Sequence, residues 1–277
     1  MQLYQKKEAT TLKIFDAHCH IFPQKLAEKA SANIGSFYSL KMRFDGSVEA
    51  LMKLYKKVGV NGCLVQSVAT VPAQVEHIND FIAQSVRDNP DMFVGFCSLH
   101  PQMEKKAIAA EIDRAISLGL KGIKLHPDFQ EFKIDDKKAY DIYEAAEGRL
   151  PILFHTGDTR FDYSSPKRLA NALKDFPNLT AIAAHFGGWS QWSDGEKYLA
   201  DNPKVYVDTS SSLYAFSPEQ ALEYIRAFTP DRIMFGTDYP MWSVEDELKN
   251  MEKLDLSGED REKIMYKTAY KLLDVDF

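Results

Sequence analysis

The chain has 277 residues, of which 45% are hydrophobic, and its formal net charge at pH 7 is −6. This length allows one large hydrophobic core or two ordinary domains. The sequence has no block of basic residues and no run of eighteen apolar residues, so we expect neither a nucleic-acid partner nor a membrane span.

The N-terminal stretch MQLYQKKEATTLK has no apolar region of the kind found in a signal peptide. The three cysteines, Cys19, Cys63 and Cys97, lie in apolar runs and form no Cys-x-x-Cys pair. Reduced thiols that pack in a core explain this pattern most simply, so we expect a cytoplasmic protein without a thiolate zinc site.

Eight short apolar runs, each bounded by turn residues, alternate along the chain with longer segments of helical period. Their hydrophobicity is nearly continuous rather than alternating, which is typical of strands in a parallel sheet that is covered on both faces. The predicted strands lie within residues 12–20, 60–69, 92–101, 120–127, 150–157, 179–188, 204–211 and 231–240.

The segments between these strands predict helices. Apolar residues at helical spacing occur at 48–58, at 108–116 before Gly119, and at 139–146 before Gly148. Ser217 and Pro218 are suited to begin a further helix, and residues 260–273 form a closing one.

Eight repeats of a strand and a helix predict a (β/α)8 barrel, for which about 250 residues is typical. Polar residues at successive strand ends, from His100 to Asp238, are 23 to 30 residues apart, which is about one strand–helix unit. An open doubly wound sheet is the rival fold, but it does not need eight such units. Since no linker divides the sequence, we expect residues 1–277 to form a single domain. No glycine-rich dinucleotide or phosphate-binding loop follows the first strand.

Histidines are concentrated where the predicted strands end, and this is the face of a barrel that carries catalytic residues. The exception is His77, which we interpret as a residue on a helix surface. Side chains alternate along a strand, so Asp16, His18 and His20 are expected to share one face. Six of the seven histidines lie at strand ends: His18, His20, His100, His126, His155 and His185.

Neutral imidazole is a good ligand for zinc and for other divalent first-row metals. His18 and His20 would supply two ligands from one strand, and His155 and Asp238 are the best candidates to complete the set. Such a site keeps a position for water, whose pKa a catalytic zinc lowers to about 7. His185 is then free to act as a base.

Two further histidines and an aspartate have structural interpretations as well. His100 and His126 both precede proline, and each could simply hydrogen-bond a loop carbonyl at a strand end. For His100 we favour this interpretation. For His126 contact with a substrate is an equal alternative. Asp208, in the sequence VDTSS, could serve only to accept hydrogen bonds from loop amides.

Four short motifs, taken as an ordered set, resemble the amidohydrolase superfamily. They are DAHCH at 16–20, LFHTG at 153–157, AHFGG at 184–188 and GTDYP at 236–240. Within the superfamily the chain is similar to the amidohydrolase 2 group, which is related to aminocarboxymuconate-semialdehyde decarboxylase. The resemblance extends from about Ile14 to the C-terminus.

This resemblance implies a (β/α)8 barrel that binds one divalent ion, usually zinc, with manganese or iron as alternatives. It implies that His18, His20, His155 and Asp238 are the metal ligands. It also implies that His185 contacts and deprotonates the metal-bound water, and that Asp238 can in addition shuttle a proton. Because relatives often pair, a homodimer is plausible.

Binuclear relatives bridge two metals with a carboxylated lysine, often on the fourth strand. Here the fourth predicted strand reads GIKLHP, and Lys124 shares a face with His126. Lys124 could therefore bridge a second metal, but we favour its being a charge partner inside the barrel.

Three functions fit these residues, each with a small-molecule ligand. The first is a metal-dependent hydrolase, in which an activated water attacks an amide, ester or lactone. The alternative is a zinc-dependent non-oxidative decarboxylase of a small unsaturated or aromatic carboxylic acid. A non-catalytic metal-binding barrel is the third, and the presence of His185 beside a sufficient ligand set argues against it.

Candidate substrate-binding residues come from the loops that follow the strands. Arg43, after the first strand, and Arg160, after the fifth, could bind a substrate carboxylate, although solvated loop arginines are the more common case. Trp189, in the sequence GGWSQW, could line the mouth of the barrel as part of an aromatic wall.

Overall fold

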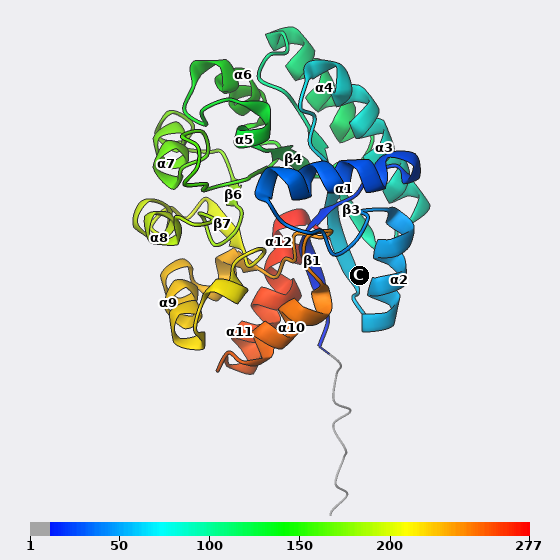
Figure 1. Ribbon diagram of the computed structural model, residues 1–277. Coiled ribbons are helices and arrows are strands. Elements are labelled where there is room, and N and C mark those ends of the chain that lie inside the picture. The colour runs from blue at the N-terminus through cyan, green and yellow to red at the C-terminus, as the bar shows by residue number, and fades with distance from the viewer. Residues whose placement is uncertain (1–11) are drawn as a thin grey trace, which may run out of the picture.

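The computed structural model describes residues 12–277, and eight parallel strands form one sheet in sequential order. Figure 1 shows the strands surrounded by helices. This arrangement confirms the predicted (β/α)8 barrel and rules out the doubly wound sheet. The strands are β1 (Phe15–His20), β2 (Gly62–Gln66), β3 (Phe93–Ser98), β4 (Gly122–Leu125), β5 (Ile152–Phe154), β6 (Ala181–Ala183), β7 (Val205–Asp208) and β8 (Ile233–Met234).

Backbone hydrogen bonds between β1 and the segment that continues β8 close the barrel. The amide of Ala17 donates to the carbonyl of Phe235 at 2.8 Å, and the amide of Asp238 donates to the carbonyl of His18 at 2.9 Å. The amide of His20 then donates to the carbonyl of Tyr239 at 2.7 Å. These hydrogen bonds extend beyond β8, which has only two regular residues. They hold the end of β1 beside the segment that follows β8.

Helices cover the outer face of the barrel, and the predicted ones are present. α2 spans Val48–Val58, α4 includes 108–116, and Ser217 begins α9 with a capping box. The α-helices are α1 (Gln24–Tyr38), α2 (Val48–Val58), α3 (Val75–Asp88), α4 (Lys105–Ser117), α5 (Pro127–Gln130), α6 (Lys137–Ala146), α7 (Pro166–Asp175), α8 (Trp192–Leu199), α9 (Pro218–Phe228), α10 (Val244–Glu252), α11 (Gly258–Glu262) and α12 (Thr268–Leu273). Short 3₁₀ turns are η1 (Pro72–Gln74), η2 (Leu213–Ala215) and η3 (Pro230–Arg232), and the π-helical turn η4 (Lys263–Lys267) joins α11 to α12.

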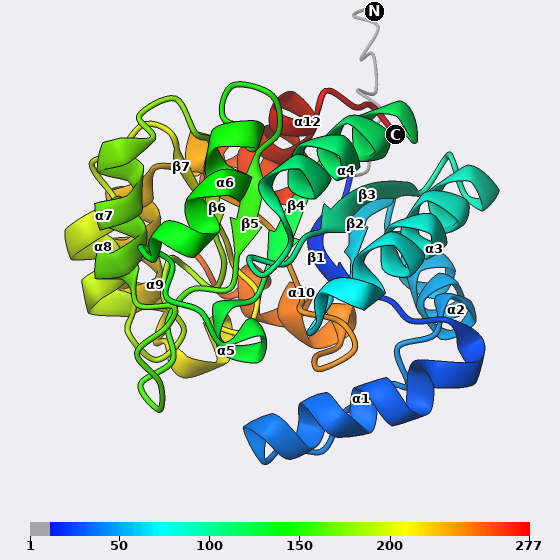
Figure 2. The ribbon, with the colours of Figure 1, turned by 90° about the horizontal axis from the view of Figure 1, so that it is seen from above.

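Helix α1 is not predicted by the sequence, and it lies apart from the ring of helices. It follows directly from the end of β1 and crosses the end of the barrel at which the strands end (Figures 1 and 2). Its buried residues are small, namely Ala27, Ser31 and Gly35. Its large apolar residues, Leu26, Ile34 and Phe37, are few and widely spaced, so hydrophobic periodicity reveals this helix only weakly.

The inside of the barrel is apolar at one end and polar at the other. Phe15, Leu64 and Phe96 belong to an apolar cluster in the lumen, which Leu273 of α12 joins. Gly122 leaves room for the ring of Phe96, since a Cβ at this position would overlap that ring. The apolar cluster fills the end of the lumen at which the strands begin, which we call the lower half. The polar residues lie in the upper half, at which the strands end.

The other predictions about the chain as a whole have mixed outcomes. Cys19, Cys63 and Cys97 are buried free thiols, as expected. None of the helices in the described part of the chain is long and apolar enough to cross a membrane. Residues 1–11 of the N-terminal stretch that is expected not to be a signal peptide lie outside the described residues.

Glu247 of α10 generates a prediction about stability. Its side chain is buried, its Oε2 has no hydrogen-bond partner among the described residues, and burial raises its pKa from 4.5 to about 8. The folded chain therefore holds more protons than the unfolded chain between these two pH values, so stability falls as pH rises through this window.

We expect the Glu247→Gln variant to lack this pH dependence. Relative to the wild type it should gain roughly 2–4 kcal/mol of unfolding free energy between about pH 4.5 and about pH 8. Urea unfolding of both proteins at several pH values measures the difference. Glu252→Gln, an exposed position on the same helix, is the control and should give a flat difference. Parallel curves for Glu247→Gln and the wild type would contradict the prediction.

Candidate metal centre

Three predicted ligands converge where β1 and β8 end. The Nε2 atoms of His18 and His20 are 3.3 Å apart, and each lies 3.5 Å from Oδ1 of Asp238. Ligand atoms at the corners of a tetrahedron around zinc, with bonds of about 2.1 Å, are separated by about 3.4 Å. The three atoms thus have the spacing of one face of a metal coordination shell, and the donor set fits a divalent ion.

A carboxylate behind His18 fixes the orientation of its ring. Oδ2 of Asp208 lies 2.9 Å from Nδ1 of His18, and Ser210 Oγ lies 3.1 Å from the same nitrogen. The carboxylate accepts a hydrogen bond from Nδ1–H, which leaves the Nε2 lone pair free to bind a metal. Asp208 also accepts hydrogen bonds from the amides of His185 and Ser210, both at 3.1 Å. It therefore holds the loop amides, as predicted, and in addition orients a ligand.

Burial sets the charge of the cluster. It lowers the pKa of His18 and His20 well below the usual value, so both rings are neutral at pH 7. Burial raises the pKa of Asp238 to about 6 and lowers that of Lys124 to about 8. Nζ of Lys124 is 3.2 Å from His18 Nε2, which places this amine beside the ligands. Its role, as a charge partner inside the barrel or as a bridge to a second metal, stays a prediction.

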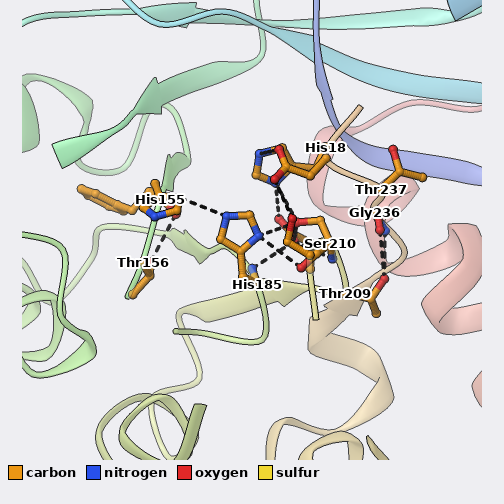
Figure 3. A network of polar contacts seen from close by, with 12 residues as sticks. His18, His155, Thr156, His185, Thr209, Ser210, Gly236 and Thr237 are labelled. Carbon is orange, nitrogen blue, oxygen red and sulfur yellow. Dashed lines mark hydrogen bonds and ion pairs between the residues drawn. The ribbon is translucent and has the colours of Figure 1, made fainter. Parts of the chain in front are cut away.

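His155 and His185 form a second pair beside the three convergent ligands. Nδ1 of His155 is 3.0 Å from Nε2 of His185, whose Nδ1 lies 2.8 Å from Ser210 Oγ (Figure 3). Burial lowers the pKa of His185 to about 4, so its imidazole is neutral and can accept a proton. No nitrogen of His155 belongs to the group of three ligand atoms at coordination spacing. Its role as a metal ligand stays a prediction.

Backbone conformation helps to aim two of these side chains. His185 and Asp238 have φ angles of 62° and 66°, in the left-handed region that residues other than glycine rarely adopt. Such strained residues cluster at functional sites, because the surrounding structure holds them there. His185 follows the end of β6, and Asp238 lies in the segment after β8 that still pairs with β1.

The sequence does not identify Asp128 as part of this site. Neither of its carboxylate oxygens has a hydrogen-bond partner among the described residues, and Oδ2 is 3.6 Å from Nε2 of His155. Burial raises its pKa to about 7. Ligand atoms of His126, Asp128 and His155 lie within 4.8 Å of one another. The only sequence signal for Asp128 is its position two residues after a strand-end histidine.

The remaining histidines lie outside the group of three ligands. His126 accepts a hydrogen bond from the amide of Phe129 at 3.3 Å and caps α5, and its Nε2 is 3.0 Å from the hydroxyl of Tyr38. Its ring stacks on that of His155 with centroids 4.0 Å apart, so it adjoins the site as well as holding the loop. Nδ1 of His100 accepts from the amide of Gln102 at 3.2 Å, so this partner in the loop is an amide and not the carbonyl that was expected.

Asp16 does not share the face of His18 and His20, and this expectation is wrong. The pairing of β1 with β2 is irregular between Asp16 and Cys19, which breaks the simple alternation of side chains. The Asp16 carboxylate instead accepts a hydrogen bond from the hydroxyl of Thr237 at 2.6 Å and is bonded to the hydroxyl of Tyr55. It anchors β1 to α2 and to the segment after β8.

The two predicted arginines are engaged elsewhere. Arg43 is exposed and pairs with Asp246 at 3.0 Å. Arg160 pairs with buried Asp158 at 2.7 Å, and it donates to the carbonyl of Phe37 at the end of α1, also at 2.7 Å. The structure therefore does not bring either guanidinium to the three ligands, and Arg160 instead fastens α1 to the loop after β5.

Aromatic side chains nearly fill the space above the ligands. Trp189 lines a small cavity with His155, His185 and Asp238, so the structure brings it to the site. A second small cavity is lined by Tyr38 and Phe129 together with the histidine cluster. Each has a volume of about 20 Å³, which is enough for a water molecule but not for a ring.

A family model described as "Amidohydrolase" matches residues 15–275. The chain therefore belongs to the amidohydrolase family, a family of enzymes with a metal-dependent barrel, as the four motifs suggested.

Among individual relatives, the chain is 28% identical to 2-amino-3-carboxymuconate-6-semialdehyde decarboxylase of Dictyostelium discoideum, over 83% of this chain and 82% of that one. It is 26% identical to Decarboxylase orsB of Emericella nidulans, over 71% and 75% of the two chains. The structure resembles that of a dihydroxybenzoic acid decarboxylase from a Polaromonas species with bound manganese and the inhibitor 2-nitroresorcinol. The TM-score is 0.74 at 17% identity, covering 95% of this chain and 97% of that one, which shows a common fold.

We expect protein purified without added metal to contain about one divalent ion per chain, because the ligand spacing is already present in the fold. His18→Ala should lose this ion, whereas His100→Ala should retain it, since His100 is buried at a strand end but lies outside the cluster. Elemental analysis measures both, and reloading with zinc or manganese tests which ion is retained. If the wild type bound no ion after reloading with zinc or with manganese, the predicted metal site would be contradicted.

A second prediction concerns the carboxylate behind the ligand. Asp208→Asn should weaken metal affinity by about 10- to 100-fold, because it removes the acceptor that fixes the ring of His18. Titration with a competing chelator gives the affinity, and circular dichroism checks the fold. Asp231→Asn, at an exposed surface ion pair, is the control. Unchanged affinity in Asp208→Asn would show that the ring needs no such support.

Proposed function

We propose that this protein is a metal-dependent non-oxidative decarboxylase of a small aromatic or unsaturated carboxylic acid. The observation that carries this proposal is the convergence of His18, His20 and Asp238 at coordination spacing in a buried site walled by aromatic side chains. Two relatives that are named as decarboxylases support the choice of carbon–carbon cleavage over hydrolysis, which the sequence alone ranked first.

The surroundings of the ligands suit an anionic, planar substrate. A divalent ion held by His18, His20 and Asp238 would supply the positive charge that neutralises a carboxylate and an adjacent oxygen. Lys124 adds an amine at the base of the site, beside His18. Removing a carboxylate from water also favours loss of CO2, because the charge is more dispersed in the transition state.

The reaction is redox-neutral and consumes one proton. A C–H bond forms at the carbon that bears the carboxylate, the bond from that carbon to the carboxylate breaks, and its electron pair returns to the ring or to the conjugated chain. CO2 leaves. We assign the proton transfer to His185, which Ser210 holds in place at 2.8 Å. Its neutral ring would first take up a proton from water and then donate it to the carbon. Asp238 is the second group able to exchange a proton.

Metal-dependent hydrolysis is the competing function, and product analysis separates the two. The metal-loaded protein is incubated with dihydroxybenzoates and, separately, with aryl esters, lactones and amides. We expect CO2 and a phenol in equal amounts from the first set and no turnover of the second. Turnover of the second set alone would establish a hydrolase, and turnover of neither would favour a non-catalytic barrel.

The role of His185 gives a further prediction. His185→Asn should keep the metal and lose about 10²- to 10⁴-fold in turnover, since a positioned acid or base contributes about this much. His100→Asn, which changes a buried strand-end histidine outside the ligand cluster, should match the wild type in both respects. Full turnover in His185→Asn would show that another group transfers the proton.

A further inference from the structure

A large apolar groove lies beside the metal centre, and the function proposed above leaves it unexplained. It has a volume of about 520 Å³, which is in the range of ligand pockets, about 300–1,000 Å³. Leu26, Ile34 and Phe37 of α1 form one side, and Ile78 and Phe81 of α3 form the other. Figure 2 shows α1 and α3 as separate elements near the end of the barrel at which the strands end.

The groove is continuous with the metal centre. His20, Ile34 and Phe129 line the groove and also the small cavity around the ligands. One candidate ligand, His20, therefore forms part of the groove floor. A molecule that reached the metal centre through this opening would pass between α1 and α5, the short helix that carries Phe129.

The space among the candidate ligands is too small for a whole substrate, so the substrate would have to extend into the groove. The cavities among the ligands measure about 20 Å³ each, whereas a benzene ring needs roughly 150 Å³. Tyr38 and Phe129 restrict this space from above. The groove is the adjoining volume that is large enough for the body of an organic acid.

The charges of the two regions differ and fix the direction in which a substrate lies. No Asp, Glu, Lys or Arg lines the groove in the described part of the chain. Its polar members include Gln74, which already bonds the backbone and side chain of Thr70, and exposed His77. A carboxylate would be costly to bury there, so it belongs at the ligands and Lys124, with the apolar end in the groove.

We propose that the groove between α1 and α3 binds an apolar substituent of the substrate, so that the substrate is an aromatic or conjugated acid with an alkyl or aryl side chain. This inference rests on the proposed function for the position of the carboxylate. A second copy of the chain that covers the groove would be a different occupant, but the shared wall at His20 favours a molecule that also contacts the metal centre.

A series of 2-hydroxybenzoates with a hydrogen, methyl, propyl or pentyl group at position 4 or 5 tests the proposal on the metal-loaded protein. Both calorimetric affinity and CO2 release are measured. We expect affinity to rise about three- to fourfold for each added methylene in one of the two positional series, since each buried methylene contributes to that extent. No dependence on chain length in either series would overturn the proposal.

Variants that fill the groove provide the matched comparison. Ile78→Trp should abolish the advantage of the pentyl over the unsubstituted compound. Ile116→Trp, at an exposed position on α4, should preserve it. An advantage that persists in Ile78→Trp would overturn the proposal, as would a dimer that dissociates in Ile78→Trp without any chain-length effect in the wild type.

The same data separate this inference from the function on which it rests. Chain-length-dependent binding without CO2 release would support the groove and contradict decarboxylation. CO2 release without any chain-length effect would support decarboxylation and contradict the groove.

Discussion

The closure of the barrel between β1 and the segment after β8 is the constraint on which the candidate site depends. The bond from the amide of Asp238 to the carbonyl of His18, at 2.9 Å, joins the two strand ends that carry the convergent ligands. Gly236 allows this approach, because a Cβ there would lie 3.2 Å from that of His18 and 3.4 Å from that of Asp208. The spacing of the ligand atoms is therefore a property of the backbone, and a metal would bind to a site that is largely preorganised.

The surroundings of the ligands complete what the backbone begins. Asp208 fixes the ring of His18, and Ser210 holds that of His185. Burial against the apolar lower half of the lumen keeps these imidazoles uncharged, which is the form that binds a metal or accepts a proton. The same burial would be costly for an unpaired carboxylate, and Asp128 has no partner in the described structure.

The sequence predicts the barrel and most of the convergent side chains, because both depend on local patterns. Apolar runs define the strands, and histidines immediately after them define the functional face. What the sequence does not predict depends on contacts between distant segments. Helix α1 buries only small residues, the irregularity in β1 turns Asp16 toward Tyr55, and Arg160 is occupied by Asp158. No periodicity or spacing in a single sequence encodes these contacts.

The candidate ligands and the apolar groove lie in different parts of this chain. The ligands come from strand ends that the barrel holds rigidly, whereas the groove is formed by α1 and α3, which lie outside the lumen. Loops and added helices vary among barrels without disturbing the strands. A change in α1 could therefore alter which acid is bound while the spacing of His18, His20 and Asp238 is kept. Because Arg160 and Tyr38 fasten the end of α1 to the loops after β5 and β4, the same helix that shapes the groove also limits access to the ligands. A substrate that fills the groove would contact α1 along its length, from Leu26 to Phe37.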